Sequence, residues 1–352
     1  MKILPFLALI ASSLFCKAQD TQTSYPAPEN NRFRIVGYAP GYRDLSRVPD
    51  RTLQRLNIAC YAFATIDSTG IPRVRDEKQL RRFARRAQRL GLDVMISFNG
   101  KHADFARMAA DAEKRRRFVA EIERLITEYR LAGVDNDWEF PRTTDGTAES
   151  NLALMKDLAR MCRSGKTHYL LTMAITSGTY PGNRSQAIGE ELAELVDWFN
   201  VMVYGDFSET QPGRHHSPYR MLEKSYGYWI VERGMDPKKF VVGLPVYGLA
   251  SGLPKKTSAT SYAGILRQNG PDAIVRDTAQ VSNSVHTEPY TVYYNGLPTI
   301  HRKVNFAIDK HLGGIMFWEI AQDTADGTSV INAACQAVES RQSSNATNSH
   351  SL

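Results

Sequence analysis

The sequence contains few cysteines and no long apolar segment. Only four of the 352 residues are cysteine, and the three that follow the N-terminal segment are widely spaced, so no disulfide framework is predicted. Cys60 lies in an apolar run and is expected to be buried, while a single Cys162–Cys335 bridge stays open as an alternative. No run of about 18 apolar residues exists, so no transmembrane helix is predicted.

Signatures of metal and nucleotide sites are also missing. The chain has no CxxC, HExxH, GxGxxG or GxxxxGK[ST] spacing, so we predict no metal site and no cofactor. The 44 Lys and Arg against 37 Asp and Glu leave a formal charge of +7. Because Arg81, Arg82 and Arg85 follow a helical pattern, we interpret such residues as a solvated helix face and predict no nucleic-acid partner; a patch for anionic polymers is the alternative. The pair His215-His216 is expected at the surface.

The N-terminus has the features of a signal peptide. It has a positively charged start, a mostly apolar run over residues 3–15 and a small-x-small cleavage site at residues 16–18. We therefore expect residues 1–18 to direct export, with the mature protein secreted or periplasmic. A lipid anchor on Cys16 is the competing hypothesis, and the bulky Phe15 before it argues against that anchor.

Composition divides the remaining chain into a leader, one domain and a tail. Residues 19–31 are polar and contain two prolines, which is typical of a leader. Residues 339–352 are polar, which predicts a disordered tail. Residues 32–338 are expected to form a single catalytic domain.

Short apolar runs alternate with helical patterns throughout this domain. The runs are rich in Val, Ile, Phe and Tyr and end near Gly, Pro, Asn or Asp, as strands do. The eight predicted strands are 33–38, 56–66, 93–97, 133–140, 169–176, 198–204, 240–247 and 314–320. Helical periodicity fills the gaps, for example at Phe118, Ile122 and Leu125.

Strands that alternate with helices predict an α/β protein with a parallel sheet. Eight such units predict one closed (β/α)8 TIM barrel, with a doubly wound open sheet as the alternative. Residues 249–299, between the seventh and eighth strands, fit the pattern least. We expect them to form a loop elaboration over the barrel mouth.

Three carboxylates occupy alternate positions of the fourth predicted strand. Asp135, Asp137 and Glu139 would share one face, about 6.6 Å apart, and line the barrel axis. Like charges this close cannot all ionise cheaply, so at least one should hold a proton near neutral pH, as a general acid must. Glu139 lies nearest the C-terminal end of the strand, where barrel enzymes place their chemistry, and is the expected proton donor.

The residues between the acids favour a strand over an acidic loop. Val134, Trp138 and Phe140 are apolar and would face the helices. Asn136 falls on the same outer face and therefore needs a polar partner there. A hard-cation site is the remaining alternative, but no further acid or amide cluster nearby completes one.

At these residues the sequence resembles glycoside hydrolase family 18, the chitinase family. The family signature reads roughly DGxDxDWE, and residues 132–139 read AGVDNDWE. The resemblance covers about residues 33–338. Weaker motifs that agree in order are Gly37-Tyr38, Tyr61-Ala62-Phe63, Ser97-Phe98-Asn99-Gly100, Met202-Val203-Tyr204, Gly243-Leu244-Pro245-Val246-Tyr247-Gly248 and Gly313-Gly314-Ile315-Met316-Phe317-Trp318.

The resemblance implies retaining hydrolysis of β-1,4-linked N-acetylglucosamine polymers, chitin or chito-oligosaccharides, in which the N-acetyl oxygen of the substrate attacks the anomeric carbon. Glu139 would protonate the leaving oxygen and later activate water. Asp137 would orient the acetamido group, and Asp135 would tune the charge of Asp137. Tyr204 would hydrogen-bond the acetamido oxygen, and Trp318 would form the apolar floor beneath the sugar.

The same motifs supply further candidates for sugar binding. Aromatic side chains suit the flat apolar faces of a neutral sugar, and polar groups suit its hydroxyls. These candidates are Tyr38, Phe63, Met202, Asp206 and Tyr247.

Three positions depart from the family pattern. One is Asn136, described above, which replaces an apolar residue on the helix-facing side. Ala132 replaces the usual first Asp, which we expect to alter the activity or its pH profile. Gly205 stands where Asp normally follows Met-x-Tyr, and Asp206 comes one residue late. Either a local bulge restores the position of Asp206, or that polar contact is lost.

Three alternatives to a chitinase stay open. One is an endo-β-N-acetylglucosaminidase that acts on N-glycans. The second is a non-catalytic chitinase-like lectin, against which the presence of Glu139 argues. The third is hydrolysis of peptidoglycan or a spore wall, where mild basicity would help at an anionic surface.

Overall fold

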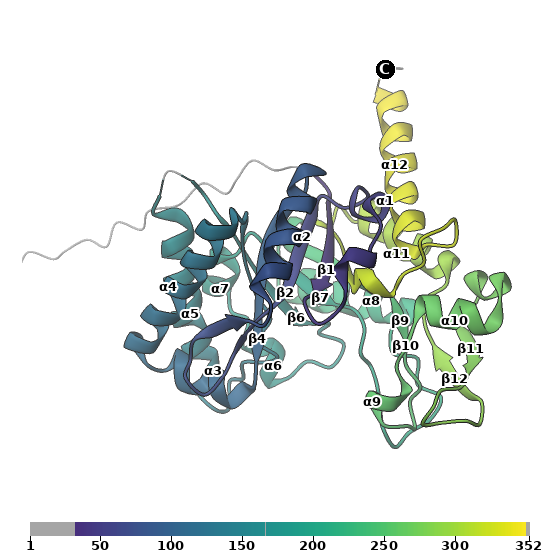
Figure 1. Cartoon of the computed structure of the whole chain (residues 1–352), viewed down its shortest axis with the longest axis horizontal. Helices are drawn as coiled ribbons and strands as arrows, with labels where there is room; N and C mark the ends of the chain where they lie inside the picture. The colour runs from purple at the N-terminus through teal and green to yellow at the C-terminus, as the bar shows by residue number, and fades with distance from the viewer. Residues whose placement is uncertain (1–31, 166, 350–352) are drawn as a thin grey trace, which may run out of the picture.

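The structure is a computed structural model that describes residues 32–165 and 167–349, with side chains described to residue 341. The predicted signal peptide and leader lie outside these residues. Eight parallel strands form a closed barrel, because each pairs with the next and β1 pairs with both β13 and β2 (Figure 1). The barrel strands are β1 (Arg34–Pro40), β2 (Ile58–Ile66), β4 (Asp93–Gly100), β5 (Gly133–Asn136), β6 (Leu170–Thr176), β7 (Trp198–Met202), β8 (Phe240–Pro245) and β13 (Gly314–Trp318).

All eight barrel strands overlap the eight predicted runs, so the (β/α)8 prediction is confirmed. A short strand β3 (Pro72–Val74) pairs antiparallel with β2 outside the ring. The helices between the strands are η1 (Leu45–Arg47), α1 (Asp50–Leu53), α2 (Glu77–Arg89), α3 (His102–Ala109), α4 (Ala112–Tyr129), α5 (Thr147–Arg163), α6 (Asn183–Gln186), α7 (Glu190–Leu195), α8 (Tyr219–Tyr226), η2 (Gly227–Glu232), η3 (Pro237–Lys239), α11 (Leu297–Asp309), η5 (Ile320–Gln322) and α12 (Val330–Ser349).

Helix α4 begins at a capping side chain and buries one apolar stripe. Asp111 accepts hydrogen bonds from the backbone N–H groups of Glu113 and Lys114 at the start of α4. Phe118, Ile122 and Leu125 of this helix are fully buried, as their spacing predicted. These buried side chains therefore hold α4 in the apolar core.

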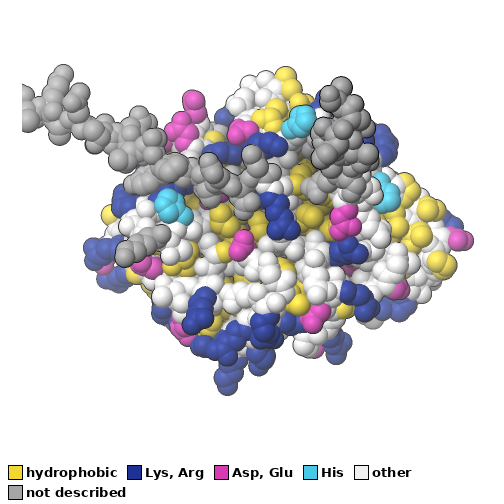
Figure 2. Space-filling view, turned by 90° about the horizontal axis from the view of Figure 1, so that it is seen from above, with side chains coloured by type: hydrophobic (Ala, Val, Ile, Leu, Met, Phe, Trp, Pro, Cys, Tyr) yellow, Lys and Arg dark blue, Asp and Glu magenta, His cyan; other side chains and the backbone are white. Residues whose placement is uncertain are grey.

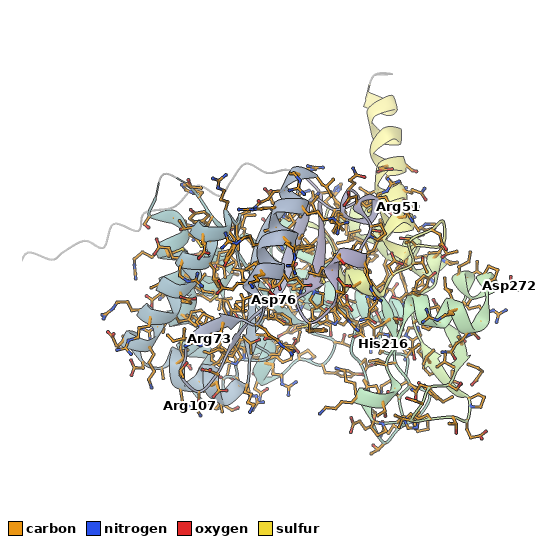
Figure 3. All side chains as sticks on the ribbon, viewed as in Figure 1. Arg51, Arg73, Asp76, Arg107, His216 and Asp272 are labelled. Carbon is orange, nitrogen blue, oxygen red and sulfur yellow. The ribbon has the colours of Figure 1, made fainter. Side chains whose placement is uncertain are left out.

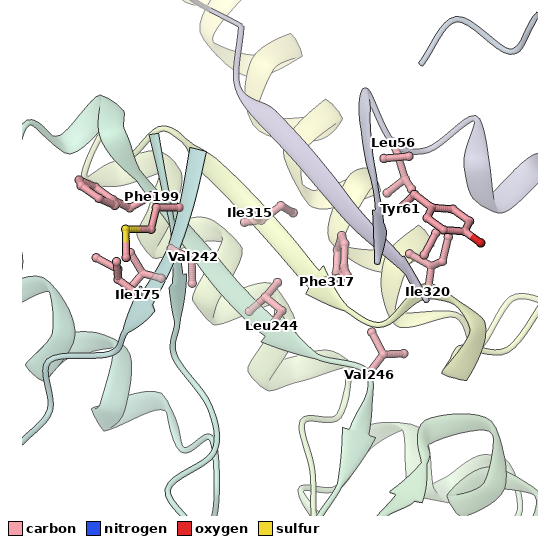
Figure 4. Packing of buried hydrophobic residues seen from close by; sticks show 14 of the residues in the cluster. Leu56, Tyr61, Ile175, Phe199, Val242, Leu244, Val246, Ile315, Phe317 and Ile320 are labelled. Carbon is pink, nitrogen blue, oxygen red and sulfur yellow. The ribbon is translucent and has the colours of Figure 1, made fainter. Parts of the chain in front are cut away.

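Alternation along each strand separates two apolar layers. On the outer face, Val242 and Leu244 of β8 lie beside Ile315 and Phe317 of β13, beneath the surrounding helices (Figure 4). The alternate residues of these two strands point inward, as Val241 and Met316 do. The barrel interior is therefore a packed core whose upper end must carry any site.

The predicted elaboration between strands 7 and 8 is a small insertion between β8 and α11 (Figure 1). Two antiparallel strand pairs, β9 with β10 and β11 with β12, carry short helices between them. Its elements are β9 (Tyr247–Gly248), α9 (Lys255–Ser258), β10 (Thr260–Ser261), α10 (Tyr262–Asn269), η4 (Pro271–Val275), β11 (Thr278–Val281) and β12 (Tyr290–Tyr293).

The alternative of a Cys162–Cys335 bridge does not hold, because both cysteines are free and buried. Both pack in the apolar core, and Cys335 Sγ donates to the Arg55 carbonyl at 3.3 Å. The expected surface position of His216 is wrong: its side chain is fully buried, and its ring packs on Tyr247 of the insertion strand β9.

The last helix, α12, continues through residues 339–349, where we expected a disordered tail. Val330, Ile331 and Val338 are buried and anchor its first turns. Once a helix is nucleated by such packing, each further residue adds one hydrogen bond at little cost, so a polar segment can extend it.

Two further features concern the surface. Basic and acidic side chains are interspersed on the face seen in Figure 2, in keeping with solvated helix faces. Within the described residues, no helix combines the length and apolarity needed to cross a membrane.

The backbone of β6 lies so close to Gly133, at the start of β5, that only glycine fits at this position. A Cβ atom there would lie 2.1 Å from the carbonyl oxygen of Leu170 on β6. We expect Gly133→Ala to force β5 and β6 apart and to lower the free energy of unfolding by about 3 kcal/mol or more, as measured by denaturant unfolding. Gly189→Ala is the control, since nothing lies within 4 Å of that Cβ. Equal stabilities of the two variants would contradict the argument.

Candidate active site

A cleft of about 630 Å³ opens at the C-terminal ends of the barrel strands. Its walls include nine of the ten predicted site residues. These are Tyr38, Phe63, Asp137, Glu139, Met202, Tyr204, Asp206, Tyr247 and Trp318. The tenth, Asp135, is fully buried beneath the cleft floor. The fold therefore brings nine of the predicted residues together at one cleft and places Asp135 in the layer beneath them.

The acidic segment leaves the sheet earlier than predicted. Strand β5 ends at Asn136, and Asp137 N–H still donates to the Phe98 carbonyl at 3.0 Å. Trp138 faces the helices as expected, fully buried and stacked on Phe105 with ring centroids 5.0 Å apart. Phe140, however, lines the cleft. The prediction that it faces the helices is wrong, because strand alternation no longer applies after the chain has left the ladder.

Asn136 has the polar partner that its outward position requires. Its Nδ2 donates to Asn151 Oδ1 of α5 at 2.9 Å, and its Oδ1 accepts from the Trp138 backbone N–H at 2.9 Å. All three residues are buried. The amide therefore ties the exit of β5 to the helix outside it and fixes the direction in which Glu139 follows.

Four donors from four different strands surround the carboxyl group of Asp135. Tyr38 and Ser97 donate to Oδ2 at 2.8 and 2.7 Å, and Thr172 and Asn200 donate to Oδ1 at 2.6 and 3.1 Å. Burial raises the pKa of Asp135, whereas these four hydrogen bonds lower it. Because every contact is a donor, the group is built to be held as a carboxylate.

Asp137 lies between this carboxylate and Glu139. Burial raises its pKa well above the usual range, and the charges of Glu139 and Asp135 raise it further. Within the described residues no side chain hydrogen-bonds to Asp137, so its carboxyl group is available to a ligand. A carboxyl group in this position retains a proton at a pH at which an exposed aspartate has lost it.

Glu139 is accessible from the cleft, but its surroundings still reduce its solvation. Burial raises its pKa, and the charges of Lys255 and then Arg184 lower it. Lys255 belongs to α9 of the insertion and lines the cleft. Arg184 of α6 lies over the ring of Phe140, 5.4 Å from its centroid. Two cations thus oppose the effect of burial on the same carboxyl group.

Aromatic rings form two walls of the cleft. Trp318 stacks on Phe63 with centroids 5.7 Å apart and meets the edge of Tyr38 at 5.6 Å. Across the barrel mouth, Tyr204 contacts Tyr247 edge-on at 6.3 Å. Flat apolar surfaces of this kind bind the faces of sugar rings.

Asp206 does face the cleft, which resolves the question raised by its late position. Gly205 adopts a φ of 88°, a left-handed conformation that turns the chain after Tyr204. Asp206 then pairs with Arg214 at 3.1 Å and accepts a hydrogen bond from Tyr180 at 3.1 Å. The turn at Gly205 therefore leaves the Asp206 carboxylate lining the cleft.

Several lining residues were not predicted from the sequence. Tyr180 and Arg214 come from two separate loops and Lys255 from the short helix α9, so only the folded chain brings them together. Ala132, at the site of the missing family Asp, packs against the inner apolar cluster below Asp135. In the part of the chain that the structure describes, no group of three or more His, Cys, Asp or Glu side chains is arranged to hold a metal ion.

A (β/α)8 barrel with a carboxylate pair and aromatic walls at its C-terminal mouth is the architecture of a glycoside hydrolase. Residues 34–323 match the family described as Glycosyl hydrolases family 18. The chain belongs to this family and is one of its glycosidases.

Named relatives agree with this assignment. Probable chitinase 10 of Drosophila melanogaster is 26% identical over 322 residues, which cover 76% of this chain but 14% of that protein. Chitinase 1 of Aphanocladium album is 25% identical, over 73% of this chain and 68% of that protein. The chain therefore spans a small part of the first relative and about two thirds of the second.

A solved structure shares the fold. The family 18 chitinase of Cycas revoluta, in complex with (GlcNAc)3, has a TM-score of 0.72 and 24% identity. The match covers 86% of this chain and 99% of that one.

The position of Lys255 leads to a prediction about Glu139. Lys255→Met removes the cation that lowers the pKa of Glu139 most, so the pKa should rise, as followed by carboxyl ¹³C chemical shifts across a pH titration. Lys256→Met is the matched control, since Lys256 is equally exposed and lies outside the cleft. An unchanged or lower Glu139 pKa in Lys255→Met would refute the proposed influence.

Proposed function

We propose that the chain hydrolyses β-1,4-linked N-acetylglucosamine polymers, chitin or chito-oligosaccharides, by a retaining, substrate-assisted mechanism. The observation that carries the proposal is the position of Asp137 and Glu139 together in the cleft wall, above the buried carboxylate of Asp135. The named chitinase relatives support the substrate class.

The chemistry assigns one task to each group. Glu139 protonates the glycosidic oxygen as the C1–O bond breaks, while the acetamido oxygen of the same sugar bonds to C1 and forms an oxazolinium ion. Asp137 accepts a hydrogen bond from the acetamido N–H and stabilises the positively charged oxazolinium ring. Tyr204 donates a hydrogen bond to the acetamido oxygen. Glu139 then takes a proton from water, which attacks C1 and restores the sugar with retained configuration.

The proton on Glu139 depends on its neighbours. Asp135 is held as an anion by four donors, and this charge makes ionisation of Asp137 costly. The upper two carboxyl groups therefore share a proton that reaches Glu139 before bond cleavage and returns afterwards. Trp318 and Phe63 provide the floor against which the sugar is held.

Two alternatives are tested with the same purified protein. An endo-β-N-acetylglucosaminidase would cleave a high-mannose glycoprotein, and a lectin would bind chito-oligosaccharides without turnover. Release of fluorophore from chitobiose and chitotriose glycosides, with no release of N-glycans, supports the proposal. Cleavage of the glycoprotein alone, or binding without turnover, overturns it.

Glu139→Gln should abolish the proton transfer while preserving the shape of the cleft. We expect kcat on chitotriose glycosides to fall by about 10³-fold or more, with chitotriose affinity retained, as measured by fluorescence release and calorimetry. Glu149→Gln, on the exposed side of α5, is the control. Near-normal turnover by Glu139→Gln would show that another group is the acid.

We also propose that the protein is exported, with residues 1–18 as the cleaved signal. Expression of the full chain in a bacterial host should yield extracytoplasmic protein whose N-terminus is residue 19, as determined by intact-mass spectrometry. A mass increase typical of a diacylglycerol group on Cys16 would instead establish the lipid anchor. Retention of residues 1–18 in cytoplasmic protein would refute export.

A further inference from the structure

A buried lysine lies behind the wall of the cleft that carries Tyr204. Lys303 of α11 is 0% exposed, and its Nζ donates to the Ser217 carbonyl, Ser217 Oγ and Asn295 Oδ1 at 2.8, 2.7 and 2.8 Å. Among residues 32–165 and 167–341, no carboxylate lies within ion-pair distance of this ammonium group. Burying a cation without an ionic partner costs free energy, and the three hydrogen bonds offset only part of that cost. A lysine at this position therefore points to a function that outweighs the cost.

Ser217 connects Lys303 to the active site through two hydrogen bonds. Its hydroxyl accepts from Lys303 and donates to the Val203 carbonyl at 2.7 Å. Val203 immediately precedes Tyr204, beyond the end of β7. Asn295 Nδ2 donates to the Ser217 carbonyl at 2.8 Å, which holds the serine from the insertion side. Lys303 is therefore two hydrogen bonds away from the backbone that carries Tyr204.

A second set of contacts supports the same wall. The His216 carbonyl accepts the backbone N–H of Asp206 at 3.0 Å, which closes the loop after Tyr204. The His216 ring packs on Tyr247 with centroids 5.0 Å apart, and Tyr247 in turn meets Tyr204. His216 lies where the insertion meets the barrel (Figure 3). The loop is thus fixed on both sides of the tyrosine.

The charges around Lys303 act in opposite directions. Burial lowers the pKa of Lys303 to about 7, and Asp277 of the insertion raises it. His215 and His216 face the same cluster; burial lowers both of their pKa values, and the charge of Lys303 lowers them further. The lowered pKa values keep the histidines neutral at pH 7, and the three acceptor atoms around Lys303 Nζ favour its charged form over the neutral amine.

We propose that Lys303 is a positioning residue for catalysis, which through Ser217 fixes the Val203–Tyr204 backbone and so sets the height of the Tyr204 hydroxyl in the cleft. The inference rests on the role of Tyr204 given above. It assigns a function to α11, a helix that supplies no residue to the cleft wall. A displaced Tyr204 would contact the acetamido oxygen poorly, and an error of about 1 Å in such a contact can cost about 10²-fold in rate.

A double-mutant cycle separates this role from a purely structural one. Ser217→Ala breaks the link to Val203 but leaves the serine carbonyl for Lys303. We expect it to lower kcat on chitotriose glycosides about 10-fold with little change in KM. Tyr204→Phe should lower kcat at least as much, and the double variant should match Tyr204→Phe alone, because both changes act through one hydroxyl. Multiplicative losses would overturn the proposal.

Matched variants keep the result interpretable. Ser225→Ala removes another fully buried serine hydroxyl, one without a hydrogen-bond partner among the described residues, and should leave kcat unchanged. Lys303→Gln retains an N–H donor and should keep more activity than Lys303→Met at equal thermal stability. Equal loss in both Lys303 variants, or a loss in Ser225→Ala like that in Ser217→Ala, would point to packing alone.

The outcome is distinguishable from failure of the proposed function. If the unaltered protein turned over none of the glycosides, the hydrolase proposal would fail first. The same cycle would then be measured as chitotriose affinity by calorimetry. Non-additive losses for Ser217→Ala and Tyr204→Phe would still support the positioning role, and additive losses would reject it.

Discussion

The site depends on one carboxyl group buried inside the barrel, whose ionised form is stabilised by four hydrogen-bond donors against the cost of burial. Asp135 accepts hydrogen bonds from side chains of β1, β4, β6 and β7, so the correct closure of the barrel is what assembles its donors. Burial and the charge of Glu139 raise the pKa of Asp137 most, and the charge of Asp135 raises it further. Any change that opened the ring would remove donors, admit water and abolish this effect on the carboxyl groups above.

The upper part of the site combines rigid and adjustable elements. Asp137 and Glu139 follow directly from β5, and Asn136 anchors that exit to α5. The cations near Glu139 come instead from two short helices outside the ring of strands, Arg184 from α6 and Lys255 from α9 of the insertion. The carboxyl pair thus follows directly from the sheet, whereas segments outside the sheet lower the pKa of Glu139 and line the cleft.

The insertion does more than cover the barrel mouth. It supplies Lys255 to the cleft, and it supplies Asn295 to the cluster around Lys303. Through Ser217 that cluster contacts the backbone before Tyr204. A segment that looked like a peripheral elaboration therefore connects α11 with a residue that contacts substrate in the proposed mechanism.

Strand alternation and helical periodicity were enough to predict eight barrel strands, because burial of one face imposes a repeat that is visible in the chain. The same alternation placed Asp135, Asp137 and Trp138 on their correct sides, and it predicted that Asn136 needs a partner. It failed for Phe140, which lies beyond the last ladder hydrogen bond. The surface position expected for His216 was also wrong, because its ring packs on Tyr247 of the insertion. The roles of Arg214, Lys255 and Lys303 could not be assigned from the sequence, because long-range contacts decide which side chains meet theirs. The sequence by itself thus determined the barrel and its acidic strand, whereas the tertiary structure decided the depth of each carboxyl group, the cations around Glu139 and the support of Tyr204.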